Sequence, residues 1–441
     1  DCDTRIDEGQ LKGDAQAGPA FTNANADGAG DVSYAVDPTS GKIAIAYSIN
    51  RSAPVAGVSF LDNNLPSGGN ANVLVHMTSP ADLYASSVGI TAMGGGKFAV
   101  AFFDTSGTRR MVAGPIDTSG APAFVASDDM MAKGLHCAAS DGDCSKLTKD
   151  GTRKPAIAAA GDDVIVAFVR APEDVMCHAK SEVVTGAPLL ANLLKVGTDG
   201  FEEQTPKAVK LGDSGSREAP ALLALPDLKT GESLGFLLAY VDVDGAIALQ
   251  SLHVNGGTIE NGGILGSLSN AKERYSGVRL ALGPKTDRGQ SVGVAFQVGC
   301  TADARVGFAL LNVKYDAQKG PLVDIDLREQ LVGGSPNEKD ANLAYSKNRD
   351  SWFVAYRAPA SGQAGAHDLR ARVLDAKGMP EGDDPYTLIK GVAMGSNATQ
   401  VFLTPGIAPT LQADGWFGVV AYTEGSGNVL STVAVGGCAK Q

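Results

Sequence analysis

The chain contains 441 residues, of which 44% are hydrophobic and 20% are charged, values that are ordinary for a globular protein and allow a sizeable core. The net charge of −12 argues against broad binding to nucleic acid or anionic lipid. No apolar run reaches the length of about 18 residues that a transmembrane helix needs.

The first predicted segment, residues 1–16, begins with the acidic stretch DCDTRIDEG. Its carboxylates are Asp1, Asp3, Asp7 and Glu8. With Cys2 they resemble the tail of DxDCDGxxDEG, a cysteine-containing metal-binding repeat of exported and surface proteins of some bacteria. Thr4 stands where the repeat has glycine, and the upstream half of the repeat is missing. The resemblance implies a structural Ca²⁺ site on oxygen ligands, and a mature fragment of a longer exported precursor. The alternative is a solvated acidic stretch.

From residue 17 onward, one pattern recurs seven times: a hydrophobic run that ends in alanine followed by phenylalanine or tyrosine. The runs are IAIAY ending at Tyr47, FAVAF at Phe102, VIVAF at Phe168, FLLAY at Tyr240, VGVAF at Phe296, WFVAY at Tyr356 and GVVAY at Tyr422. They follow one another at intervals of 55 to 72 residues. Such a period is typical of a repeated four-stranded sheet with variable loops.

Each run forms the second strand of a predicted hairpin. In the clearest copy, residues 155–159 and 164–170 are β-rich and flank a Gly-Asp-Asp turn. Further apolar runs follow the second hairpin, RMVAGPID from Arg110 and APAFVASD from Ala121, and predict a third and a fourth strand. Every unit is therefore expected to contain four strands.

Seven such sheets predict an all-β chain that folds as a single seven-bladed β-propeller over residues 17–441. The seventh unit ends at its third strand, and residues 17–25 resemble the fourth strand of the second unit. We therefore expect strand 17–25 to complete the seventh blade and to close the ring. The alternative is two or more β-sandwich domains, but no linker interrupts the period.

Six cysteines in an acidic, glycine-rich β-protein indicate an oxidising location and up to three disulfides. They are Cys2, Cys137, Cys144, Cys177, Cys300 and Cys438. Ring closure would bring Cys2 close to Cys438, so we predict that pair and leave the pairing of the other four open. His136 and His178 adjoin cysteines and raise zinc as an alternative, but the close-paired spacing typical of zinc ligands is absent.

Six charged residues come just after the second-strand aromatics, namely Asp104, Arg170, Asp242, Asp244, Arg357 and Glu424. Loops from several blades converge on one face of a propeller, so these charges predict a binding surface for a polar or cationic group. The alternative is that charges simply meet water where strands end.

The sequence contains no GxSxG, HExxH or Walker motif, and its MGGGK stretch reads as a hairpin turn. We therefore expect a noncatalytic extracellular or cell-surface module for adhesion, scaffolding or assembly, with surface proteins or glycan as partners. The alternative is a secreted glycan-active hydrolase or lyase. Three or more carboxylates converging within hydrogen-bond reach would favour that enzyme.

Overall fold

A computed structural model describes most of the predicted repeats. The described residues are 11–17, 29–37, 42–49, 55–61, 75–76, 85–104, 110–117, 155–169, 187–197, 200–203, 209–216, 218–226, 235–299, 303–316, 320–347, 350–362, 365–393, 404–406, 416–424 and 429–437. All regular secondary structure within them is β-strand, which confirms the prediction of an all-β chain. In the described part of the chain we find no helix long and apolar enough to cross a membrane.

The strands form seven antiparallel sheets, which we number in chain order. Sheet 1 contains β2 (Ala29–Val36), β3 (Ile43–Ile49), β4 (Val55–Leu61) and β5 (Val75–His76); sheet 2 contains β6 (Ala85–Gly94), β7 (Lys97–Asp104) and β8 (Arg110–Asp117); sheet 3 contains β9 (Ala156–Ala160), β10 (Asp163–Val169), β11 (Ala187–Gly197), β12 (Gly200–Glu203) and β13 (Val209–Ser216). Sheet 4 contains β14 (Ala221–Ala224), β15 (Phe236–Val241), β16 (Ile247–Asn255) and β17 (Thr258–Leu268); sheet 5 contains β18 (Tyr275–Thr286), β19 (Gly289–Val298), β20 (Arg305–Asp316) and β21 (Gly320–Leu331). Sheet 6 contains β22 (Lys339–Ser346), β23 (Ser351–Pro359), β24 (Ala366–Asp375) and β25 (Tyr386–Ala393); sheet 7 contains β26 (Thr404–Gly406), β27 (Trp416–Glu424), β28 (Val429–Gly437) and β1 (Leu11–Ala17).

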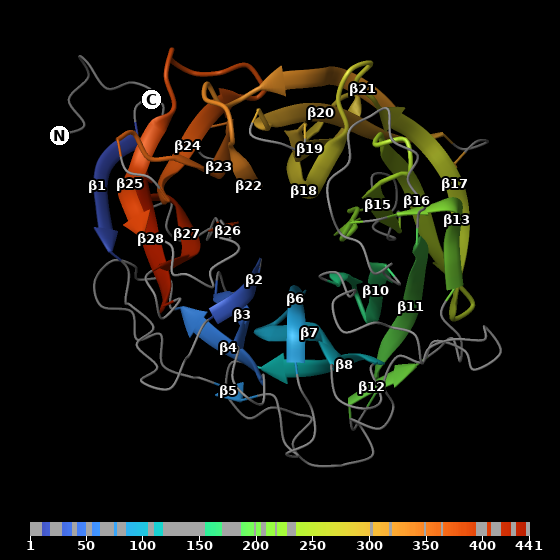
Figure 1. Ribbon diagram of the computed structural model, residues 1–441. Helices are drawn as coiled ribbons and strands as arrows, with labels where there is room; N and C mark the ends of the chain where they lie inside the picture. Colours follow the sequence, from blue (N-terminus) through green and yellow to red (C-terminus); the bar gives the residue numbers. More distant parts are fainter. Residues whose placement is uncertain are drawn as a thin grey trace.

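The sheets are arranged radially, with their first strands toward the centre (Figure 1). The first strand of each sheet contacts the first strand of the next, from β2 through β6, β9, β14, β18 and β22 to β26. Strand β26 in turn contacts β2. Sheet-to-sheet contacts therefore run in chain order and return from the last unit to the first.

The seven Ala-aromatic runs lie in the second strands, β3, β7, β10, β15, β19, β23 and β27, as predicted. The repeat alanines Ala46, Ala101, Ala167, Ala239, Ala295 and Ala355 are all fully buried. Tyr47 and Phe296 each lie over a glycine of the third strand, because a Cβ on Gly57 or Gly307 would come within 3 Å of the ring. The runs are apolar at every position because neighbouring sheets cover both faces of each sheet.

The hydrophobic core is divided among the spaces between successive sheets. Separate clusters of buried side chains lie between sheets 1 and 2, 2 and 3, 3 and 4, 4 and 5, and 5 and 6. A polar contact adds to one of these interfaces: Asp37, buried in sheet 1, accepts a hydrogen bond of 2.7 Å from the amide of Gly96 in the turn before β7. Gly96 has a φ of 79° there, so the MGGGK stretch forms the hairpin turn that the sequence predicts.

Three details differ from the predicted four-strand units. Sheet 2 has three strands among the described residues, and the predicted strand that begins at Ala121 lies outside them. Sheet 3 has five, because the long β11 pairs with β12 near one end and with β13 near the other. The strand that pairs with β28 is β1 (Leu11–Ala17), earlier in the chain than the predicted strand 17–25.

Pairing of β1 with β28 should stabilise the last sheet. Removing residues 1–17 would expose the edge of β28, so we expect the free energy of unfolding to fall by about 1–4 kcal/mol and self-association to increase. A protein lacking only residues 1–10 retains β1 and is the matched control. Calorimetry and light scattering check the prediction, which fails if both shortened proteins are equally stable and monomeric.

The approach of β6 to β9 requires glycine at position 89. A Cβ on Gly89 would lie 2.5 Å from the carbonyl oxygen of Pro155. Gly89→Ala should therefore lower the free energy of unfolding by roughly 1–3 kcal/mol, since the backbone must shift. Gly266→Ala, where a Cβ would meet nothing within 4 Å, should have little effect. Urea denaturation of both variants makes the comparison, and equal stabilities would contradict the close approach.

Candidate functional site

The first strands of sheets 1 to 6 line a cavity of about 180 Å³. Its walls come from residues 33–34, 89–90, 155–157, 219–222, 279–280 and 342–343. These segments belong to β2, β6, β18 and β22, and to the starts of β9 and β14. The cavity therefore lies at the centre of the radial arrangement (Figure 1).

One register position supplies one lining residue from each of these six sheets. In every sheet it is the first-strand residue paired with the repeat alanine of the second strand. The six residues are Ser33, Gly89, Ala156, Ala221, Arg279 and Asn342. Thr404 holds the same register position in β26, opposite Ala421. In each of these six sheets the residue that follows this position also lines the cavity.

The seven residues at this position divide into two arcs. Gly89, Ala156 and Ala221 in sheets 2, 3 and 4 form an arc of small residues. The other four sheets, 5, 6, 7 and 1, carry arginine, asparagine, threonine and serine. Small residues therefore occupy this position in sheets 2 to 4, and polar residue types occupy it in the other four sheets.

Hydrogen bonds hold two polar residues of the lining. The Nη1 of Arg279 donates to the carbonyl oxygen of Val278 at 2.8 Å, which keeps the guanidinium beside β18. The hydroxyl oxygen of Ser33 accepts from the amide of Ile90 at 3.3 Å and so links sheets 1 and 2. Burial raises the pKa of Tyr34 above its ordinary value, so its hydroxyl ionises even less readily than that of a solvent-exposed tyrosine.

The remaining lining residues are mostly apolar, including Ile90, Ile157, Leu222 and Leu343. An apolar wall with a few convergent polar groups is typical of a small-molecule binding site. The described lining contains no Asp or Glu, so the converging carboxylates that would favour glycan cleavage are not found among these residues.

The structure does not place the six charged residues of the sequence prediction in this cavity. Asp104 and Glu424 are the last residues of β7 and β27, and Arg170 lies outside the described residues. Asp242 and Asp244 share the turn before β16, where Asp242 Oδ1 accepts from the amides of Asp244 and Ala246, each at 2.9 Å. Burial raises the pKa of Asp242 against the effect of these hydrogen bonds.

Arg357 directly follows the aromatic residue of the second strand, as predicted, but it lies within β23 and is buried. Its Nη2 is 2.9 Å from Oδ2 of Asp340 in the neighbouring strand β22. Because removing one partner of a buried ion pair leaves an uncompensated charge, this arginine has a structural role in sheet 6. Of the six predicted residues, Arg357 is therefore buried, whereas Asp244 is exposed.

The predicted metal and disulfide residues lie outside the described part of the chain. This applies to Asp1, Asp3, Asp7 and Glu8, and to Cys2, Cys137, Cys144, Cys177, Cys300 and Cys438. Within the described residues, no group of three or more His, Cys, Asp or Glu side chains could hold a metal ion.

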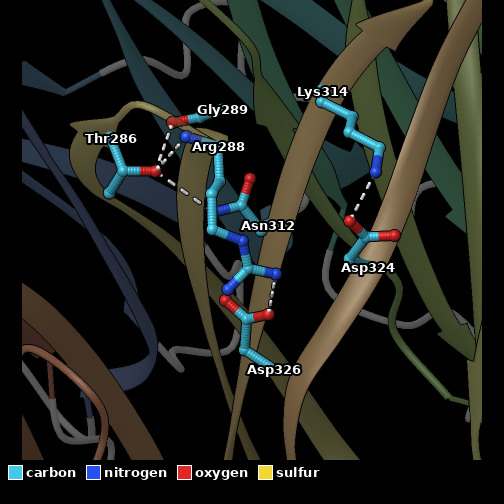
Figure 2. A network of polar contacts seen from close by, with 7 residues as sticks. All are labelled: Thr286, Arg288, Gly289, Asn312, Lys314, Asp324 and Asp326. Carbon is cyan, nitrogen blue, oxygen red and sulfur yellow. Dashed lines mark hydrogen bonds and ion pairs between the residues drawn. The ribbon is translucent and has the colours of Figure 1, made fainter.

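A second polar cluster lies in sheet 5, around the turn between β18 and β19 (Figure 2). Thr286 Oγ1 donates to the Gly289 carbonyl and accepts from Asn312 Nδ2. Arg288 pairs with Asp326, and Lys314 with Asp324, each at 2.6 Å. Both pairs are partly exposed to solvent and add little stability, so the cluster is best explained as a solvated turn and strand edge.

A buried carboxylate, Glu338, connects sheets 5 and 6. Its oxygens accept from the amides of Ser335 at 2.9 Å, Gly334 at 3.1 Å and Val306 at 3.5 Å. Burial raises its pKa above the ordinary 4.5, and the hydrogen bonds only partly oppose the shift. The folded protein therefore retains a proton at Glu338 that the unfolded chain releases at lower pH.

Because its pKa is raised in the folded protein, Glu338 contributes most to the free energy of unfolding below about pH 4.5. This contribution decreases as the pH rises through the pKa that Glu338 has in the folded protein. Glu338→Gln removes that dependence. Relative to the unchanged protein, the variant should therefore gain stability between pH 4 and pH 7. Thermal unfolding across this range measures the difference, with Asp383→Asn as the exposed control. A constant difference between variant and parent would show that Glu338 is not the titrating group.

Comparison with known proteins gives no family. No family model matches the chain, and no curated protein matches it either. Solved structures similar to it include a protein of unknown function from Dyadobacter fermentans, with 11% identity and a TM-score of 0.45 over 80% of this chain and 94% of that one. The fucose-specific lectin of Aleuria aurantia has 9% identity and a TM-score of 0.41, covering 82% and 96%. The Trypanosoma rangeli sialidase, in complex with sialic acid, has 8% identity and a TM-score of 0.41, covering 80% and 54%. These values transfer no ligand and no activity to this chain.

Proposed function

We propose that the chain is a seven-bladed β-propeller, closed by β1 in the last blade, that works as a noncatalytic extracellular or cell-surface binding module. The fold assignment is supported by the radial sheets, by the contacts that return from β26 to β2, and by the pairing of β1 with β28. Its role is adhesion, scaffolding or assembly into a larger bacterial surface structure.

The binding function is inferred from the central cavity. Six sheets contribute to its wall, so its shape depends on the whole assembly. Arg279, Asn342 and Ser33 are held there by register opposite buried alanines, which positions them without depending on loop conformation. Rigid placement of a few polar groups in an apolar wall is what selective binding needs.

The location and the partners come from the sequence. Six cysteines and the acidic N-terminal repeat motif support export and a structural calcium ion, and the partners are surface proteins or glycan presented outside the cell. The partner would insert one small group into the cavity, because the cavity has about 180 Å³.

Filling the cavity should abolish partner binding without unfolding the protein. Ala219 lines the cavity just before β14, so Ala219→Trp places an indole in it. Ala271 comes before β18, is exposed and is not among the lining residues, so Ala271→Trp is the matched control.

Binding of labelled protein to arrays of immobilised glycans and surface proteins provides the measurement. We expect at least a tenfold loss for Ala219→Trp and no loss for the control. If Ala219→Trp retains full binding and an unchanged melting temperature, the cavity is not the binding site and the proposal is wrong.

A further inference from the structure

We propose that Asn261 in β17 converts to aspartate and isoaspartate in the folded protein, with the backbone nitrogen of Gly262 as the nucleophile. The site is separate from the central cavity and goes beyond the proposed binding function. The sequence contains two Asn-Gly pairs, at positions 255–256 and 261–262, and a second glycine follows each of them. Glycine has no side chain that would shield its backbone nitrogen, so both pairs have the local sequence that this reaction needs. The structure distinguishes one pair from the other.

The reaction is a cyclisation followed by hydrolysis. The backbone nitrogen of Gly262 attacks Cγ of Asn261, so a bond forms between these two atoms and negative charge develops on Oδ1. The intermediate then expels Nδ2 as ammonia, which leaves with the amide proton of Gly262. Water opens the resulting five-membered succinimide ring at either of its two carbonyl carbons and gives aspartate or isoaspartate. No atom is oxidised or reduced, and water is the only other reactant.

Asn261 lies in an exposed bulge of an outer strand. Strand β17 is the last strand of sheet 4 and lies at its outer edge (Figure 1). The pairing of β17 with β16 runs from Asn261 directly to Ile264 and skips Gly262 and Gly263. Asn261 and Gly262 are both exposed. The attacking nitrogen therefore belongs to a residue outside the regular ladder, and water reaches the site.

The side-chain amide of Asn261 is held through its oxygen. Oδ1 accepts a hydrogen bond from the backbone amide of Gly263 at 2.9 Å and another from Nε2 of Gln250 at 2.6 Å. The backbone amide can only donate, so this contact fixes which side-chain atom of Asn261 is the oxygen. Gln250 is buried, which holds the second donor in place. Two donors on Oδ1 stabilise the negative charge that develops there when Gly262 attacks.

The side-chain amide of Asn255 is held through its nitrogen instead. Asn255 ends β16, and its Nδ2 donates to Oε1 of Glu260 at 2.9 Å. This contact retains the nitrogen that has to leave. A carboxylate at position 255 would also face the carboxylate of Glu260, and like charges so close repel each other. A carboxylate at position 261 would keep both of its donors and would accept stronger, charge-assisted hydrogen bonds.

The packing of β17 requires the glycine that makes Asn261 reactive. A Cβ on Gly262 would overlap Oγ of Ser251, which is buried in β16. A larger residue at position 262 would therefore disturb the contact between the two strands. The reactive pair is thus a consequence of how closely β17 approaches β16.

Peptide mapping by mass spectrometry after prolonged incubation at neutral pH tests the proposal. Both asparagines lie between Lys229 and Lys272 on one tryptic peptide, and fragment ions measure conversion at each position. Enzymatic methylation of isoaspartate identifies the second product. We expect Asn261 to convert at least tenfold faster than Asn255 in the folded protein. In urea-unfolded protein the two rates should be similar, because both asparagines precede two glycines.

Gln250→Met removes one donor from Oδ1 and keeps a side chain of similar length. It should slow the conversion of Asn261 in the folded protein at least threefold and leave Asn255 unchanged. Gln330→Met is the matched control, since Gln330 in β21 donates to the carbonyl of Leu331, and it should change neither rate. Melting temperatures show whether each variant is folded. If Gln250→Met does not fold, the comparison of folded with unfolded parent protein decides the matter.

Equal rates at the two asparagines of the folded protein, or faster conversion of Asn255, would overturn the proposal. Conversion of Asn261 only after unfolding would also overturn it, because the fold would then protect the site. An unchanged rate at Asn261 in folded Gln250→Met would contradict the stabilisation of Oδ1 on which the proposal rests.

Discussion

The rest of the structure depends on how closely the first strands pack around the centre. The repeat alanine of the second strand, which pairs with the first strand, is fully buried in all six copies whose burial is described. At the contact between β6 and β9 even a methyl group is too large, since the Pro155 carbonyl would be 2.5 Å from a Cβ on Gly89. This packing brings each sheet against two neighbours. Both of its faces are then covered, and the core is distributed between sheets instead of forming one central cluster.

The repeat could be read from the sequence because that constraint acts in the same way in every unit. Apolar runs with a buried alanine and a buried aromatic residue recur wherever a second strand lies between two sheets, so the seven second strands were all predicted. The hairpin around Gly161 was predicted to within one or two residues, because a glycine with a φ of 61° is required at its turn. The strand paired with β28 was assigned too late in the chain. LKGDAQA has almost no hydrophobic pattern, and the edge position of β1 explains why none is needed.

The candidate site was not predicted, and the reason lies in how charge was interpreted. Charges after a strand run were expected at a surface, but Arg357 continues β23 and pairs with Asp340 inside sheet 6. Asp242 bonds to the amides of its own turn. The informative residues were within the first strands, in SYAV, RLAL and NLAY, where one polar residue interrupts an apolar run. Aligning the units on the residue opposite each repeat alanine would have gathered Ser33, Arg279 and Asn342 at one level. That step requires the pairing register, which a single sequence gives only for hairpins with short turns.

A repeated fold separates the residues that build the molecule from those that can vary. Pairing fixes the backbone at the position opposite each repeat alanine, whatever side chain that position carries. At Gly89 this position allows β6 and β9 to approach closely, whereas Ser33, Arg279 and Asn342 contribute polar residues to the lining of the cavity. The pairing register at this position is therefore repeated from sheet to sheet, whereas its side chain differs. Because six sheets each contribute one such residue, the lining of the cavity combines residues spread along the chain, and no local motif can reveal it.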